Sequence, residues 1–271
     1  MPDEKEIGKQ SFPLLAWLSQ QLQLQRSSRG IGEAILEKFA AHFGESSVFV
    51  LTARSEENLS KSKIVAGAAK TFVCHFFGVD FASFSSTETK DFEKTLNNAI
   101  DGRKFEAAVV VHNAGTVGDV KEKASNMEDM GKMDAYLHLN VSAMVAINAA
   151  FLRATKGAGV RFVVNVSSLA AVQGMESFGY YSAGKAAREG FLRVLAEEEK
   201  ELRVLNYCPG PIDTAMVKEI EAESHAERIR NFFADSRKKE ALVTREQTAT
   251  RLFDILDENS FESGCRIDFY D

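Results

Sequence analysis

The stretch "YYSAGKAAREGF" (180–191) holds the two side chains best suited to proton transfer, Tyr181 and Lys185. They stand four residues apart, so a helix places both on one face. There an ammonium beside a phenol favours the phenolate and lowers a pKa that is ordinarily about 10. Ser168 stands thirteen residues upstream, at the end of the apolar run "RFVVNVSS". Because parallel sheets place their sites at the carboxyl ends of strands, these three residues predict an acid–base site there.

Other motifs make this pair specific, since Tyr and Lys at this spacing are common by themselves. "HNAG" (112–115) follows an earlier apolar run, and "PGP" (209–211) follows a later one. Three apolar runs therefore end in residues that could line one site. Tyr180 lies at the wrong spacing for Lys185, and we expect it to pack or to line the pocket.

The elements that must position these residues alternate along the chain. The strand-like runs are 47–53, 71–80, 107–115, 160–168 and 203–210, and they are continuous rather than alternating, as in strands covered on both faces. Helical patterns lie at 31–43, 56–69, about 85–100, 128–156 and 180–200. Strands that alternate with helices, without hairpin signals, indicate crossover connections. We therefore predict an α/β fold, a doubly wound (Rossmann-type) parallel sheet in a single domain.

The segment 213–243 interrupts this alternation with a charged helical pattern, before a last helix (245–258) and a last strand in "GCRIDFYD". An insertion after the carboxyl end of a strand is typical of a lid over a ligand. A solvated surface helix fits the pattern as well.

Composition excludes some classes of function. The 271 residues carry 33 Lys and Arg against 39 Asp and Glu, a formal net charge of −6, which disfavours nucleic acid or an anionic membrane as the main partner. Cys74, Cys208 and Cys265 are widely spaced and predict reduced thiols. The histidines show no metal-ligand spacing, so no metal is expected; they are His42, His75, His112, His138 and His225. No long apolar run and no signal-peptide pattern is seen, so we expect a cytoplasmic protein.

From about Ser27 to Asp271 the chain resembles the short-chain dehydrogenase/reductase superfamily and, within it, the sepiapterin reductase family. The motifs are "SSRGIG", "LTARS", "HNAG", "LNVSAM", "NVSSLAA", "YSAGKAAR", "RVLNYCPGPIDTAM" and "SGCRIDFYD". We therefore divide the chain into an atypical segment, 1–26, and a reductase domain, 27–271.

The resemblance implies roles for four catalytic residues. Tyr181 would donate a proton to the substrate carbonyl oxygen, and Lys185 would lower the pKa of Tyr181 and bond the nicotinamide ribose. Ser168 would hold the carbonyl, and Asn140 in "LHLNVSA" would complete a proton relay. Asp268 would anchor the guanidine-like edge of a pterin by paired hydrogen bonds. The implied substrate-binding residues are Ser168, Tyr181, Gly210 and Asp268.

NADPH is the expected cofactor. Arg54, after the second strand, stands where an NAD-dependent enzyme usually has an acid, and Arg29 could reach the same 2′-phosphate. The implied cofactor-binding residues are Ser28, Arg29, Gly30, Ile31, Gly32, Arg54, Ser55, Asp80, Phe81, Asn113, Ala114, Gly115, Tyr181, Lys185, Pro209, Ile212, Asp213, Thr214 and Met216.

The resemblance implies an NADPH-dependent carbonyl reductase that acts on a pterin side-chain ketone, as in tetrahydrobiopterin formation. A reductase of other ketones or dicarbonyls is an alternative. A catalytically impaired isoform that acts through dimerisation is another, since helices 128–156 and 180–200 are the pair that the superfamily uses in a homodimer interface.

The chain departs from the resemblance before Ser27. The family's loop is T-G-x-x-x-G-x-G, but this chain has Gln25 for the Thr and Arg26 for the first Gly. "LQLQ" occupies the place of a buried central strand, where each unpaired Gln amide would cost a few kcal/mol. A replaced N-terminus, a strand that forms with weaker stability and cofactor binding, and a loss of catalysis are the three explanations. We favour the first.

Overall fold

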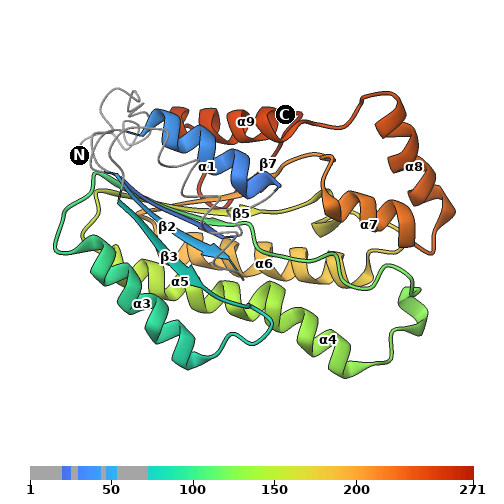
Figure 1. The fold of residues 1–271 in the computed structure, drawn as a ribbon, viewed down its shortest axis with the longest axis horizontal. Coiled ribbons are helices and arrows are strands. Elements are labelled where there is room, and N and C mark those ends of the chain that lie inside the picture. The colour runs from blue at the N-terminus through green and yellow to red at the C-terminus, as the bar shows by residue number, and fades with distance from the viewer. Residues whose placement is uncertain (1–19, 26–29, 44–46, 54–72) are drawn as a thin grey trace, which may run out of the picture.

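The computed structural model describes residues 20–25, 30–43, 47–53 and 73–271, which form a layered α/β domain (Figure 1). The strands are β1 (Gln20–Gln25), β2 (Val48–Ala53), β3 (Val73–Gly78), β4 (Ala107–His112), β5 (Val160–Val166), β6 (Leu202–Cys208) and β7 (Arg266–Asp268). The longer helices are α1 (Ile31–His42), α3 (Ser86–Ile100), α4 (Met130–Leu137), α5 (Ala143–Ala154), α6 (Gly179–Glu198), α7 (Ala215–Glu223), α8 (Glu227–Lys238) and α9 (Arg245–Glu258). A π-helical turn, η3 (His138–Ser142), joins α4 to α5.

The sheet confirms the predicted doubly wound topology. Its strand order is β3-β2-β1-β4-β5-β6-β7, and every pairing between these strands is parallel. The order turns around between β1 and β4, where such sheets open a crevice for ligands. The predicted strands and helices correspond to the observed ones, except the helix predicted at 56–69, which lies outside the described residues.

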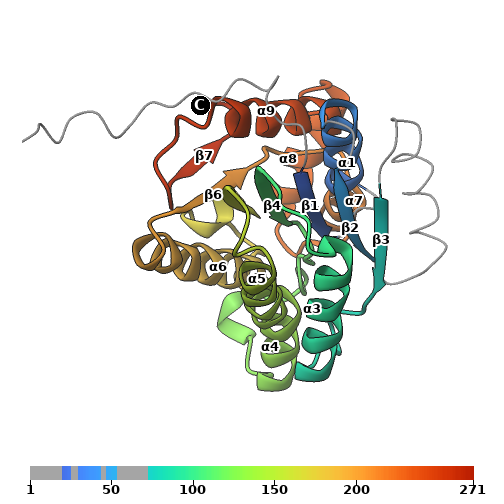
Figure 2. The same cartoon turned by 90° about the vertical axis from the view of Figure 1, so that its left-hand side faces the viewer.

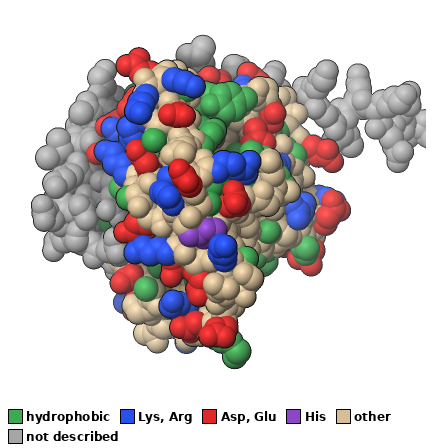
Figure 3. Space-filling view, turned by 90° about the vertical axis from the view of Figure 1, so that its right-hand side faces the viewer, with side chains coloured by type: hydrophobic (Ala, Val, Ile, Leu, Met, Phe, Trp, Pro, Cys, Tyr) green, Lys and Arg blue, Asp and Glu red, His purple; other side chains and the backbone are tan. Residues whose placement is uncertain are grey.

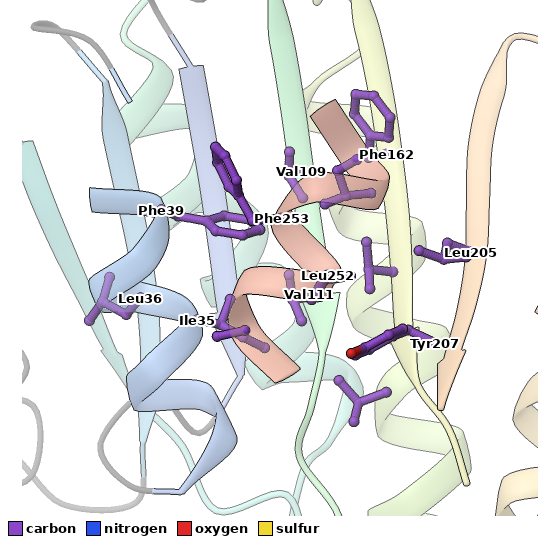
Figure 4. Packing of buried hydrophobic residues seen from close by; sticks show 14 of the residues in the cluster. Ile35, Leu36, Phe39, Val109, Val111, Phe162, Leu205, Tyr207, Leu252 and Phe253 are labelled. Atoms are coloured by element: carbon purple, nitrogen blue, oxygen red, sulfur yellow. The ribbon is translucent and has the colours of Figure 1, made fainter. Parts of the chain in front are cut away.

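Helices cover both faces of the sheet (Figure 2), and the core accordingly has two halves, one on each face. Alternate residues of a strand point to opposite faces. Val109 and Val111 of β4 therefore belong to the cluster under α1 and α9 (Figure 4), while Ala108 and Val110 belong to the cluster over α3, α5 and α6. This double coverage explains the continuous apolar runs in the sequence.

The glutamine-rich segment occupies the centre of the sheet. The backbone of β1 lies between β2 and β4, with Gln21 in register with Val48 and Ala108, and Gln23 with Val50 and Val110. The strand therefore forms despite its sequence, as the second explanation above requires. Backbone hydrogen bonds do not depend on side-chain type, so a Gln-rich segment can complete the sheet.

The charged segment after β6 forms the helices α7 and α8. Val217, Ile220, Ile229 and Phe233 bury their side chains in a third apolar cluster with Phe178. Basic and acidic side chains lie interspersed over the face that carries these helices (Figure 3). One side of α7 and α8 therefore packs against the domain, and their other side is solvated.

One helical stretch in the described part of the chain, Met130–Ala154, is long and apolar enough by composition to cross a membrane. The π-helical turn η3 interrupts it, and Met144, Ile147 and Phe151 are buried in the core beneath the sheet. Its apolar character is therefore explained by packing within the domain.

Candidate active site

A cavity of about 270 Å³ lies at the carboxyl ends of β4, β5, β6 and β7, between α6 and the helices α7 and α8. It brings together most of the residues that the sequence predicted for the site. The predicted residues on its wall are Ile31, Asn113, Gly115, Ser168, Tyr181, Lys185, Pro209, Gly210, Ile212, Thr214, Met216 and Asp268. Much of the remaining wall is apolar, with Met175, Phe178, Val217, Ile220 and Phe233. The cavity therefore suits a small organic molecule that a few polar side chains orient.

Ser168, Tyr181 and Lys185 meet on one side of this cavity. Ser168 follows β5, and its Oγ accepts a hydrogen bond from the backbone N–H of Ala170 (3.2 Å). Tyr181 shares a side-chain hydrogen bond with Ser168. Lys185 Nζ donates a hydrogen bond to the carbonyl oxygen of Val166 (2.6 Å) and lies 5.4 Å from the centroid of the Tyr181 ring.

Burial raises the pKa of Tyr181 to about 12, and the hydrogen bond with Ser168 lowers it by less. The loss of solvent around the phenol therefore shifts its pKa in the direction opposite to the one that the Tyr–Lys spacing predicted. Tyr181 consequently keeps its proton at neutral pH, as a proton donor must.

Asn140 lies beside this group but not on the cavity wall. The turn η3 holds its buried side chain against the segment after β4: Oδ1 accepts from the Thr116 N–H (2.8 Å), and Nδ2 donates to the Tyr136 carbonyl (2.9 Å). A Cβ on Gly115 would lie 3.0 Å from Asn140 Oδ1, so the two segments are in close contact. Asn140 therefore fixes the backbone at Gly115 and Thr116.

The start of α1 suits a phosphate group. Gly30 has a φ of 64°, a left-handed conformation that glycine adopts without strain, and α1 begins there without a side-chain cap. The first N–H groups of such a helix are suitable partners for a phosphate. With Asn113, Gly115, Lys185 and the stretch Pro209–Met216 near the same crevice, the described residues fit a dinucleotide.

Other predicted cofactor residues lie away from the cavity wall. Gly32 and Ala114 are buried, and Phe81 packs against Phe84. Asp80 Oδ1 accepts the Ala82 N–H (3.1 Å) in a turn, and Asp213 is bonded to Arg237 of α8. Arg26, Ser28, Arg29, Arg54 and Ser55 lie outside the described residues, so the 2′-phosphate site stays a prediction.

Buried Arg188 was missed at the level of sequence. It is 1% exposed; Nη1 donates to the Ala114 carbonyl (3.0 Å), and Nη2 donates to the His112 carbonyl (2.6 Å). Burial lowers its pKa to about 10, and the neighbouring Tyr136 and Tyr181 oppose this shift. Its position seven residues after Tyr181, two helical turns, was the signal available in the sequence.

Asp268 lies at the cavity in an ion pair that the sequence analysis also missed. Arg266 Nε and Nη2 donate to its two carboxylate oxygens, each at 3.1 Å. Arg266 Nη1 donates to the Ser168 carbonyl (2.9 Å) and to Oε1 of buried Glu189 (2.6 Å). The i, i+2 spacing of Arg266 and Asp268 was the available signal, since it puts both on one face of a strand.

Four other residues singled out by sequence have ordinary surroundings. Tyr180 is buried against Tyr136, with ring centroids 5.5 Å apart, so it packs rather than lining the cavity. Burial lowers the pKa of His112 to about 3, and its Nε2 donates to Asn148 Oδ1 (3.2 Å). Cys208, on the cavity wall, and Cys265 are free thiols whose pKa values are raised by burial. Among the described residues, no cluster of His, Cys, Asp and Glu could hold a metal ion.

Comparison with known proteins identifies the class. The sequence profile of the short chain dehydrogenase family matches residues 27–225. The sepiapterin reductase of Xenopus tropicalis is 32% identical over 254 residues, which cover 92% of this chain and 95% of that protein. The crystal structure of the KRED1-Pglu enzyme has a TM-score of 0.77 at 21% identity, covering 92% of this chain and 100% of that chain. A short chain dehydrogenase from Shigella flexneri 2a, solved with NADP, has a TM-score of 0.74 at 23% identity, covering 94% and 99%.

With a profile match over most of its length and a relative above 30% identity, the chain belongs to the short-chain dehydrogenase family of oxidoreductases. Among its relatives it is similar to the sepiapterin reductases. The profile match begins at residue 27, after β1, so the glutamine-rich strand lies outside it.

Proposed function

We propose that this protein is an NADPH-dependent carbonyl reductase that reduces the side-chain ketone of a pterin. The observation that carries the proposal is the layout of the cavity. Ser168, Tyr181 and Lys185 stand on one side of it, and the carboxylate of Asp268 also reaches its wall. The ketone of such a substrate would lie at Ser168, Tyr181 and Lys185. The hydrogen-bonding edge of its ring would lie at Asp268. The similarity to sepiapterin reductases supports this choice.

The residues of this chain supply the proton and hold the carbonyl. NADPH, when bound, supplies the hydride. Ser168 Oγ holds the carbonyl oxygen, and Tyr181, protonated because burial raises its pKa to about 12, gives its proton to that oxygen. The phenolate that this step forms on Tyr181 is stabilised by the nearby positive charges of Lys185 and Arg188.

Several residues would hold the cofactor. The N-terminus of α1 at Gly30 would bind the pyrophosphate, and Asn113 and Gly115 would contact the adenosine half. Lys185 would bond the nicotinamide ribose. Ile212, Thr214 and Met216 would line the nicotinamide. We propose NADPH rather than NADH on the basis of Arg29 and Arg54 in the sequence, with the NADP-bound relative from Shigella flexneri in support.

The test is turnover of sepiapterin. Purified protein mixed with NADPH and sepiapterin should consume NADPH, followed as loss of nicotinamide absorbance. Saturating NADPH should also raise the melting temperature, because a ligand that binds only the folded state stabilises it. A folded protein that gains stability with NADPH but never reduces sepiapterin would disprove the pterin assignment.

A reductase of other dicarbonyls is the second candidate, because the cavity wall is mostly apolar and Asp268 is already paired with Arg266. The variant Asp268→Ala separates the two. Loss of sepiapterin turnover with unchanged turnover of butane-2,3-dione supports the pterin reading. Equal loss for both substrates counts against it.

We also propose a cytoplasmic homodimer that pairs through α5 and α6. The resemblance to the superfamily supports this pairing, and Val194 on α6, which is 54% exposed, is available for a subunit contact. Sedimentation at several concentrations measures the mass directly, and a monomer at all of them would reject the dimer.

A further inference from the structure

The guanidinium of Arg266 joins three elements beside the cavity wall. Nη1 contacts Glu189 of α6 and the carbonyl of Ser168 after β5, while Nε and Nη2 take both oxygens of Asp268 on β7. The side chain of Arg266 is 18% exposed, and that of Glu189 is 2% exposed. The buried carboxylate of Glu189 therefore holds Nη1 of Arg266. Nε and Nη2 form a fork of two parallel donors that faces Asp268, whose carboxylate lines the cavity.

The fork occupies the edge of Asp268 that a pterin needs. Two parallel N–H groups bind a carboxylate through both of its oxygens, as arginine does here. The guanidine-like edge of a pterin presents the same pair of parallel donors. Two such forks cannot share one edge, so a pterin and Arg266 compete for Asp268.

We propose that Arg266 is a specificity-determining residue that closes the two-oxygen edge of Asp268 against ligands with paired N–H donors. Such a ligand binds only after it displaces the fork, whereas a small ketone or dicarbonyl is unaffected. The proposal rests on the function proposed above and deepens it, since it sets how strongly the cavity favours pterins. Arg266 acts through Asp268 and takes no part in the proton transfer.

The surroundings of Arg266 make displacement feasible. Its Nη1 contacts do not involve Asp268, so an arginine that leaves the carboxylate keeps Glu189 as a partner. Glu189 is also bonded by Ser167 Oγ and lies 3.5 Å from Arg193 Nη1. The network behind the cavity therefore does not depend on the Arg266–Asp268 pair alone.

The experiment measures binding of 6-methylpterin, a pterin ring without the ketone, to the protein saturated with NADP⁺. Arg266→Lys retains a charge for Glu189 but cannot fork onto Asp268. Calorimetry should show binding about tenfold tighter than in the wild type, the equivalent of one regained charge-assisted hydrogen bond. Arg193→Lys is the matched control, since Arg193 contacts Glu189 but not Asp268, and its affinity should equal that of the wild type.

Kinetic constants distinguish this role of Arg266 from a purely structural one, which would not change KM for sepiapterin alone. In Arg266→Lys the KM for sepiapterin should fall about tenfold with kcat unchanged, and both constants for butane-2,3-dione should stay at wild-type values. Adding Asp268→Asn should remove the gain. A second variant, Arg266→Gln, is compared at a temperature where its melting curve shows it folded.

Three results would overturn the proposal: equal or weaker 6-methylpterin binding in both Arg266 variants, no binding in any form, or a parallel change for butane-2,3-dione. Failure of the proposed function is a different outcome. In that case no form reduces sepiapterin although each reduces butane-2,3-dione, while 6-methylpterin still binds more tightly to Arg266→Lys.

Discussion

The carboxyl ends of β5, β6 and β7 differ sharply from the first crossover, β1 to α1. At the former, side chains determine the arrangement: Arg266 and Glu189 tie Ser168 and Asp268 together, and nearby Arg188 holds the end of β4. At the latter, the backbone determines it: β1 pairs on both sides in the place of a central strand, although its sequence is "QQLQLQ".

The difference separates two requirements of an enzyme. A strand is placed by ladder hydrogen bonds, which any non-proline residue can make, so the fold tolerates an unusual sequence there. A catalytic group needs particular atoms within hydrogen-bond distance, so the carboxyl ends of β5, β6 and β7 tolerate little change. Substitutions at the carboxyl ends of β5, β6 and β7 should therefore reduce turnover, whereas substitutions in β1 should change stability.

The largest effect is expected from Tyr181→Phe. Removal of the phenolic proton should lower kcat for ketone reduction by about a thousandfold, in the range typical of a general acid. Absorbance assays with NADPH give the rate. The NADPH-induced rise in melting temperature should persist, because the fold and the cofactor crevice are retained. Turnover within tenfold of the wild type would show that another group supplies the proton.

A smaller effect, on stability, is expected from Gln21→Val combined with Gln23→Val. Both positions pair with apolar residues of β2 and β4, in a sheet whose neighbouring strands are covered on both faces. Removing two amides should raise the free energy of unfolding by about 2–4 kcal/mol, measured in urea. Gln173→Val, at an exposed turn, is the control and should give no gain. An unchanged double variant would mean that the amides of β1 cost nothing.

The smallest effect is the pH dependence that His112 contributes. Its pKa is lowered by burial from 6.5 to about 3, so below the unfolded value only the unfolded chain takes up the proton. The free energy of unfolding should therefore fall by about 2 kcal/mol through His112 as the pH is lowered from about 7 to about 5. In His112→Asn, urea unfolding at the two pH values should show a correspondingly smaller difference. The partly exposed His225, replaced in the same way, is the comparison; equal slopes for both variants would contradict the prediction.

Most of the fold could be predicted because its signals are local. Apolar runs such as "AAVVVH" and the helical patterns between them predicted a doubly wound parallel sheet once right-handed crossovers were assumed. The elements of the site were predictable for the same reason, since Ser168 follows β5 and Tyr181 lies in the first turn of α6. β1 was the exception: its alternating Leu and Gln indicate a strand with one exposed face, and the tertiary pairing overrides that pattern.

The site was harder to predict where burial, or contacts between residues far apart in the sequence, determines a pKa or a hydrogen-bond partner. The Tyr181–Lys185 spacing predicts a lowered phenol pKa, but the enclosed cavity raises it. Asp268 was expected to present a carboxylate to the ligand, yet Arg266 already bonds both its oxygens. Glu189 and Arg188 have no motif of their own, because their partners come from other strands.

The sequence by itself determined the class of fold, the residues able to hold and protonate a carbonyl, and their order along the chain, because these depend on periodicity and short spacings. Only the tertiary structure decided the central place of β1, the protonation of Tyr181 and the pairing of Arg266 with Asp268. Those properties depend on solvent exclusion and on contacts between residues as many as 98 positions apart, such as Arg266 and Ser168.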